Sequence, residues 1–213
     1  MIYKLTLLAL FFIYALSGYA LDEKHWTKEM KALDVILISL PCYACSAIEA
    51  ETHSEFSHIG IVLQIDEEIV VAHSLGKVHL VSLENFLGLA RKKSKMALLR
   101  LRPNLMKESL YTDFNYWERK FKLYFQGKPY DLLFEWKEQS PIDAYYCSEF
   151  VAKFIDDDLA LKSPLGPMTF QKFPEFWNSY FKGQVPEGKL GNSPQSFLTD
   201  LRFQLLMYFR KGM

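Results

Sequence analysis

The stretch AYYCSEFVAKFI, residues 144–155, places Cys147 between two tyrosines and the first turn of an amphipathic helix. A lone cysteine is most often a small buried apolar residue. A cysteine attacks a carbonyl carbon as its thiolate, however, and the free amide groups of a helix N-terminus lower the pKa of a thiol placed there. Helical spacing predicts that Glu149, in the same turn, faces solvent and does not oppose that effect. Cys147 is therefore a candidate nucleophile.

Two of the five histidines are candidates for the base that such a nucleophile needs. His58 opens HIGIVLQI, the most apolar strand predicted in the chain, where a bare imidazole needs a partner. His73 ends the next predicted strand, and a hairpin about residues 66–68 brings the two histidines side by side. His79 fits a surface or structural position. His53 lies in a polar loop, where it could face either solvent or a substrate.

Cys42 and Cys45 are close enough in the sequence to bridge each other. An odd number of cysteines in an oxidising compartment leaves one thiol over, and this pairing leaves Cys147. A local disulfide or a substrate-side loop fits the pair better than a redox centre, because the residues after Cys45 are too polar for the helix of a thioredoxin-like motif. Zinc is a weaker alternative, since no second Cys-x-x-Cys pair is present. We expect no metal.

Composition bounds the class of protein and its partners. The chain has 213 residues, 50% of them hydrophobic and 15% aromatic, which suits one domain with a substantial core. Its 25 basic and 25 acidic residues balance, so no field of one sign would attract nucleic acid. The oligomeric state is left open.

The first twenty residues have the pattern of a secretory signal peptide. A short charged start precedes an apolar run from Leu5 to Leu16, and small residues precede a cleavage site near Leu21. The run is too short for a comfortable membrane span, although an uncleaved N-terminal anchor is the alternative. We expect a signal peptide over residues 1–20, an exported domain over residues 21–213, and no integral membrane span after signal removal.

The chain changes its hydrophobic period halfway. The first half predicts a small antiparallel meander, with strands over residues 34–39, 58–65, 69–74, 77–81 and 95–101, helical turns through residue 52 and a short helix capped by Ser82. The second half predicts a long amphipathic helix from Leu110 to Tyr124, another after Cys147, a short aromatic one within 170–181, and a last one over about 195–209. The fold class is α+β.

Five pieces of the chain follow one another in an order that resembles a known family. They are THSEFSHIGIVL, VVAHSLGKVHLVSLENFL, GKPYDLLFEW, YYCSEFV and NSPQSFL. Together they resemble the YiiX/YebB-like proteins, exported members of the circularly permuted branch of the NlpC-type papain-like cysteine hydrolases. The likeness covers residues 34–197. It implies a permuted papain-like fold, in which helices pack on a small antiparallel sheet and a cysteine at a helix N-terminus faces histidines on adjacent strands.

The resemblance implies roles for the three candidate catalytic residues. Cys147 is the nucleophile and His58 the general base, and His73 stands where relatives often carry glutamate. The lecithin-retinol acyltransferase-like enzymes of the same superfamily also use two histidines and a cysteine. We expect His73 to fix the tautomer of His58, and His58 to hold Cys147 as a thiolate that attacks a carbonyl and forms an acyl-enzyme.

Further residues could contact the substrate or the oxyanion. The backbone amide of Cys147 would stabilise the oxyanion, together with a hydroxyl group from Tyr145 or Tyr146. Tyr130 is a candidate for the cleft, as is His53. For the pair Tyr130-Asp131 we favour a structural role, with Asp131 capping the local chain.

The sequence predicts a periplasmic or secreted cysteine hydrolase without metal or organic cofactor. The leading substrate is an amide bond in cell-wall peptide. A lipid esterase or acyltransferase of the same fold is the alternative enzyme, so the expected partner is a peptide or an acyl-containing molecule of the cell envelope. A non-catalytic binding module, or a thiol-redox protein that uses Cys42 and Cys45, is the alternative outside hydrolysis.

Overall fold

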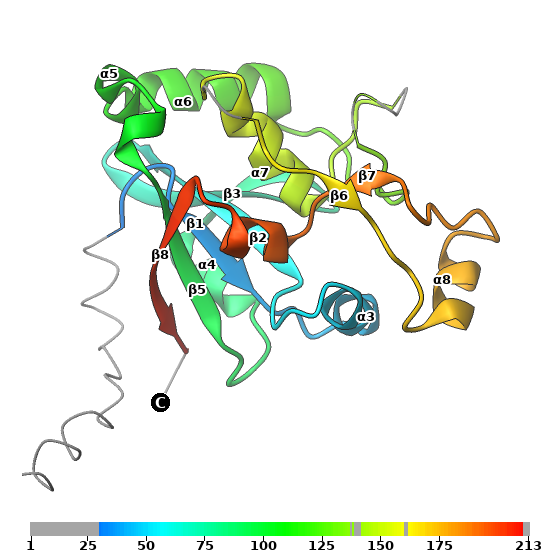
Figure 1. Cartoon of the computed structure of the whole chain (residues 1–213). Helices are drawn as coiled ribbons and strands as arrows, with labels where there is room; N and C mark the ends of the chain where they lie inside the picture. Colours follow the sequence, from blue (N-terminus) through cyan, green and yellow to red (C-terminus); the bar gives the residue numbers. More distant parts are fainter. Residues whose placement is uncertain (1–29, 137, 139–141, 160–161, 211–213) are drawn as a thin grey trace, which may run out of the picture.

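The computed structural model describes residues 30–136, 138, 142–159 and 162–210 (Figure 1). The predicted signal peptide lies outside this described part. Within it, six antiparallel strands form one sheet in the order β4-β3-β2-β1-β5-β8. These strands are β1 Val35–Ile38, β2 His58–Ile65, β3 Glu68–Leu75, β4 Lys77–Ser82, β5 Met96–Leu101 and β8 Phe203–Phe209.

The predicted β2–β3 hairpin is present, and its turn is one residue tighter than the predicted turn over residues 66–68. Ile65 pairs with Glu68, so the turn consists of Asp66 and Glu67, with φ angles of 48° and 67°. Positive φ at both positions is the backbone twist that joins two right-twisted strands with two residues. Gly76, with φ of 71°, makes the next reversal into β4. Strands β1 to β4 therefore form the predicted meander, and β5 returns to the free edge of β1.

The sheet is covered on both faces, because its strands alternate two sets of apolar residues. Ile59 and Ile61 belong to the core on the side of α7 (Cys147–Asp156). Val62 and Val71 belong to a second core, together with Phe86 of α4 (Leu83–Gly88). The predicted cap of α4 is present: the hydroxyl of Ser82 accepts from the Asn85 amide at 3.2 Å.

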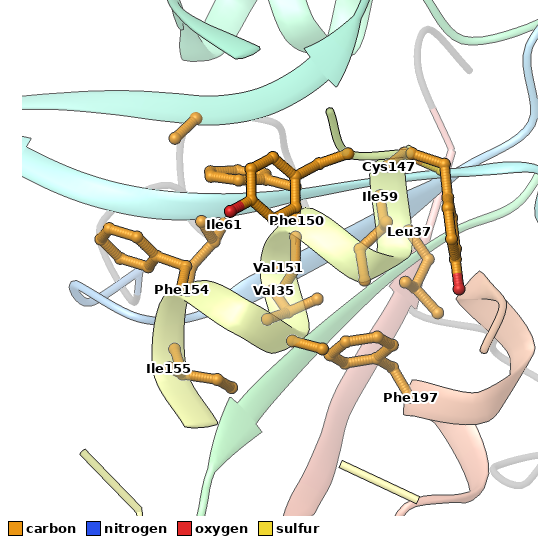
Figure 2. Close-up of a cluster of buried hydrophobic side chains, with 14 of the residues drawn as sticks. Val35, Leu37, Ile59, Ile61, Cys147, Phe150, Val151, Phe154, Ile155 and Phe197 are labelled. Carbon is orange, nitrogen blue, oxygen red and sulfur yellow. The ribbon is translucent and has the colours of Figure 1, made fainter. Parts of the chain in front are cut away.

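Helix α7 lies at the centre of the molecule. Figure 2 shows its apolar side chains packed over strands β1 and β2: Phe150, Val151, Phe154 and Ile155 from the helix, Val35, Leu37, Ile59 and Ile61 from the strands. The helix also contacts the π-helical turn η3 (Phe121–Phe125), whose Phe121 and Phe125 pack on Phe150. Glu149 is 0% exposed. The prediction that Glu149 faces solvent is wrong, because the spacing of one helix does not reveal what packs on its other side.

The predicted helix from Leu110 to Tyr124 is interrupted. It divides into α5 (Glu108–Tyr111) and α6 (Phe114–Lys120), because the Asp113 carboxylate accepts from the Tyr116 amide at 2.9 Å and starts a new helix. The π-helical turn η3 follows, and its wider turn rotates Leu123 and Tyr124 into solvent. Gly127 ends the segment with φ of 80°, as expected.

The remaining short elements lie at the two ends of the sheet. They are α3 (Tyr43–Glu51), the 3₁₀ turn η2 (Pro103–Leu105), α8 (Pro174–Tyr180) and the two-stranded sheet of β6 (Gly166–Pro167) and β7 (Leu190–Gly191). The predicted helical turns through residue 52 and the aromatic helix within 170–181 are confirmed as α3 and α8. None of the helices in the described ranges is long and apolar enough to cross a membrane.

The predicted C-terminal helix over residues 195–209 is wrong beyond residue 199. Helix α9 (Pro194–Thr199) is followed by strand β8, which pairs with β5. Arg202, buried between them, donates to Asp156 of α7 and to Asp200, each at 2.9 Å. The free edge of β5 and this buried ion pair outweigh the local helical spacing, since backbone pairing and burial decide the state of an ambiguous segment.

Gly60 sets the distance between β2 and the α4 layer. A Cβ atom at this position would lie 2.5 Å from Cγ1 of Val71 and 2.8 Å from Cε2 of Phe86. We expect Gly60→Ala to lower the free energy of unfolding by about 1–3 kcal/mol, the usual cost of overpacking a core, as measured by urea denaturation. Gly166→Ala is the matched control, because no atom lies within 4 Å of its Cβ position. Equal stability of the two variants would contradict this account of Gly60.

Candidate active site

The free thiol of the described chain lies at the N-terminus of α7. Cys147 is the first residue of the helix, and Tyr146 before it offers no side-chain cap. The first bond of the helix runs from the Phe150 amide to the Tyr146 carbonyl at 2.9 Å. The amides of the first turn before Phe150 therefore have no partner within the helix, and the positive end of the helix dipole lies at the thiol.

The residues that lead into α7 are hydrogen-bonded to the start of β2 and the end of β3, which lie next to each other, opposite the β2–β3 turn. The Ser74 hydroxyl of β3 donates to the Tyr145 carbonyl at 2.7 Å, and the Cys147 thiol donates to the Ser57 carbonyl at 4.0 Å. Ser57 is itself held, because its hydroxyl accepts from the Leu40 amide at 3.0 Å and donates to Glu49 of α3 at 2.9 Å. The sulfur thus adjoins the residue immediately before His58.

The predicted proximity of His58 and His73 is confirmed. Nε2 of His58 and Nδ1 of His73 are 2.9 Å apart, and the two residues are 2% and 1% exposed. Both rings pack against Phe86, with centroid distances of 5.8 and 5.2 Å. In the described part of the chain, the Cys147 thiol forms no hydrogen bond with either ring. The thiol and the imidazole pair therefore adjoin the same end of β2 without yet bonding to each other.

A cavity of about 320 Å³ opens onto Cys147. Its described lining residues are mostly aromatic, aliphatic or small and hydroxylated, and include Ser57, Tyr130, Phe134, Met168, Phe170 and Gln195. Glu51 alone among them carries a charge. Its carboxylate accepts from the indole of Trp177 at 2.9 Å and from the Lys172 amide at 2.6 Å. It thus holds the irregular covering segment, residues 163–194, against α3. The cavity therefore presents neutral groups beside the thiol.

Burial controls the protonation of the site. Desolvation raises the pKa of Cys147 to about 12, although the backbone amides of Ser148 and Ile59 lower it. Desolvation also lowers the pKa of His73 to about 3 and that of His58 well below its ordinary value, and the neighbouring histidines add to both shifts. All three shifts favour neutral groups. The structure therefore opposes the thiolate–imidazolium pair that the sequence led us to expect, because burial outweighs the helix N-terminus.

The other sequence-predicted residues are divided between the cavity and elsewhere. Tyr146 lines the cavity, and its hydroxyl accepts from the Asn192 amide at 3.1 Å. Tyr130 lines it too. Tyr145 does not: its ring packs on Phe125 and borders a separate hollow. His53 is exposed and lies outside the lining.

The structural roles expected for two other features are confirmed. The Asp131 carboxylate accepts from the amides of Leu133 at 2.8 Å and Glu135 at 2.6 Å, so it fixes the local chain. Cys42 and Cys45 form a disulfide at the start of α3. A bonded pair offers no thiolate to a metal.

Sequence reasoning missed Asn192. The residue is buried and lines the cavity, its side-chain amide donates to the Ser148 carbonyl at 3.3 Å, and its Oδ1 is buried without a hydrogen-bond partner. Its position at the head of NSPQSFL, one of the five family-like pieces, was the available signal. Asn192 lies in a loop after a long irregular segment, so no helical or strand periodicity in the sequence relates its position to that of Cys147.

The histidine strands precede the cysteine helix that packs on their antiparallel sheet, and this order fits the permuted form of the papain-like fold. Residues 30–207 match the family described as "Permuted papain-like amidase enzyme, YaeF/YiiX, C92 family". The chain belongs to this family. Membership confirms the family and the fold expected from the sequence.

Individual relatives agree with this assignment. The chain is 28% identical over 116 residues to the uncharacterized protein YiiX of Escherichia coli strain K12; the alignment covers 54% of this chain and about half, 52%, of that protein. The crystal structure titled "metalloprotein yiiX" from Escherichia coli O157:H7 matches with a TM-score of 0.72 at 21% identity, covering 84% of this chain and 98% of that one. This second likeness shows the fold. Among the residues described here, no group of three or more histidine, cysteine or acidic residues is arranged to hold a metal ion.

The raised pKa of Cys147 makes its reactivity testable. Because the folded protein keeps this thiol protonated at neutral pH, we expect iodoacetamide to modify it slowly. The rate should continue to rise above about pH 8.5, the usual pKa of a thiol, because the pKa of Cys147 is higher. Mass spectrometry of the labelled peptide across a pH series gives the rate, and Cys147→Ser identifies the signal. Rapid labelling that is complete in mild acid would show a thiolate instead.

The lowered pKa of His73 predicts a loss of stability in acid. Between pH 6.5 and about 3 the unfolded chain binds a proton here that the folded chain does not, so stability falls as the pH decreases. His73→Gln should reduce this slope by up to about 1.4 kcal/mol per pH unit, measured by urea denaturation at several pH values. The exposed His53→Gln should leave it unchanged. Parallel curves for wild type and His73→Gln would refute the assignment.

Proposed function

We propose that this chain is an exported cysteine hydrolase that cleaves an amide bond through an acyl-enzyme, with Cys147 as nucleophile, His58 as general base and His73 as the residue that orients His58. One observation carries the proposal. A free thiol at an uncapped helix N-terminus borders a cavity, and it adjoins the end of the strand where two buried histidines are bonded to each other. Packing alone does not require two imidazoles beside a thiol.

The neutral state of the groups determines the first step. Nε2 of His58 is occupied by His73, so Nδ1 is the nitrogen left to accept a proton. As Sγ of Cys147 bonds to the carbonyl carbon, its proton passes to His58, and no ion pair has to exist beforehand. His58 then gives this proton to the leaving amine, and water, activated by the same nitrogen, releases the acyl group and restores the thiol.

The oxyanion that forms during attack needs donors near Cys147. The amides of the first turn of α7 have no partner within the helix, and the amide of Cys147 itself is the nearest of them in the chain. The hydroxyl of Tyr146 borders the same cavity and still has its own proton to donate, since it accepts from Asn192. Tyr146 is therefore the better of the two tyrosine candidates, because Tyr145 lies outside the cavity.

The cavity lining restricts the substrate. Glu51, its charged member, is already bonded to Trp177 and to the covering segment, so no free charge faces a bound group. A buried charge without a partner is costly, and a cell-wall peptide would therefore have to place an uncharged segment beside Cys147. The aromatic and aliphatic lining also favours a second candidate, a lipid esterase or acyltransferase of the same fold.

The decisive experiment compares two substrate classes. We expect the purified protein, without residues 1–20, to release products from peptidoglycan fragments and to lose at least about 10³-fold of this activity in Cys147→Ala and in His58→Ala, the scale of removing a member of a catalytic set. His53→Ala, a change at an exposed histidine, should retain full activity. Liquid chromatography with mass spectrometry identifies the bond cleaved.

Other results would change the proposal. Release of fatty acid from phospholipid vesicles, with the same dependence on Cys147, supports the lipid alternative. Turnover that survives Cys147→Ala would end the proposed mechanism. Circular dichroism of each variant separates loss of chemistry from loss of fold.

A further inference from the structure

A third histidine accompanies the buried pair. The register of β3 and β4 places His79 directly opposite His73, and their ring centroids are 4.4 Å apart. Nδ1 of His79 lies 2.8 Å from the carbonyl oxygen of Lys77. A carbonyl oxygen can only accept, so Nδ1 of His79 carries a proton and donates it to this oxygen.

The buried pair has a choice between two tautomeric arrangements. One proton lies between Nε2 of His58 and Nδ1 of His73. If His58 donates it, Nδ1 of His58 keeps a lone pair and His73 carries its own proton on Nε2. If His73 donates it, His58 carries its proton on Nδ1 and has no lone pair left for the thiol. Burial lowers the pKa of both rings, so at neutral pH the choice is between these two neutral forms.

Nε2 of His73 is the atom that distinguishes the two arrangements. It is buried and has no hydrogen-bond partner. The two nitrogens of an imidazole lie on different sides of the ring, and Nδ1 is bonded to His58 on β2, so Nε2 is the nitrogen available toward the other neighbouring strand, β4, whose His79 ring centroid lies 4.4 Å from that of His73. The two rings are tilted by 47°, and a proton on Nε2 that reaches the face of the His79 ring would gain a weak attraction. A lone pair there would meet the same electron density and gain nothing.

We propose that His79 is a positioning residue, which favours the proton of His73 on Nε2 and thereby leaves Nδ1 of His58 unprotonated. The carbonyl of Lys77 holds the His79 ring in place for this contact. The catalytic consequence rests on the proposed function, since it matters only if His58 takes the proton of Cys147. The tautomers themselves can be measured without a substrate.

Nuclear magnetic resonance of protein labelled with ¹⁵N in histidine tests the proposal near neutral pH. Long-range ¹⁵N–¹H correlation should give His58 a pyrrole-type Nε2 and a pyridine-type Nδ1. His79→Leu removes the ring and should shift the tautomer ratio of His58 about threefold toward protonated Nδ1, the scale of one weak N–H···π contact. His79→Phe restores an aromatic face and should restore the wild-type pattern. His53→Leu is the matched control.

Two results would overturn the proposal. One is a wild-type spectrum in which His58 carries its proton on Nδ1. The other is an unchanged His58 pattern in His79→Leu, or in His79→Gln if the leucine variant does not fold. If the tautomers are as expected and no amide is cleaved, the proposed function fails while the role of His79 stands. If amide cleavage depends on Cys147 but the tautomers differ, only the role of His79 fails.

Discussion

The packing of α7 on the sheet is the constraint on which the other features depend. Phe150, Val151 and Phe154 hold the helix against β1 and β2, and this fixes its first residue, Cys147, at the open end of β2 (Figure 2). Because the same strand begins with His58, one packing interface brings the thiol and the imidazole pair to the same place. The covering segment, held by Glu51, then closes the cavity around the sulfur.

Burial has two opposite consequences for this arrangement. It keeps the thiol and both imidazoles neutral, which costs reactivity in the resting protein. It also removes water from the place where charge develops during attack, so that amides of the α7 N-terminus act more strongly on an oxyanion. Cys147 therefore does not need to be a thiolate before the substrate binds, because its proton can leave during the attack. Under the proposed mechanism the tautomer of His58 becomes the important variable, and it is one that His73 and His79 would set.

The sequence predicted the parts of the fold whose contacts are local or strictly periodic. The bounds of β2, the hairpin that follows it and the Ser82 cap all follow from neighbouring residues. The C-terminal strand did not, because FQLLMYF becomes β8 only by pairing with the distant β5. The division of the long helix also escaped prediction, since its apolar stripe continues through the Asp113 cap and the π-helical turn.

The candidate site divides in the same way. The sequence by itself determined the residue types, the family to which they belong and the proximity of His58 to His73, because a hairpin between their two strands brings these ends of the strands together. Only the tertiary structure decided that Glu149 is buried, that Tyr146 rather than Tyr145 borders the cavity, and that Asn192 and His79 join the site. Each of these outcomes depends on whether a segment distant in the sequence packs against the side chain in question. Desolvation, and with it the protonation of Cys147, is a property of that covering and is encoded in no single stretch of the chain.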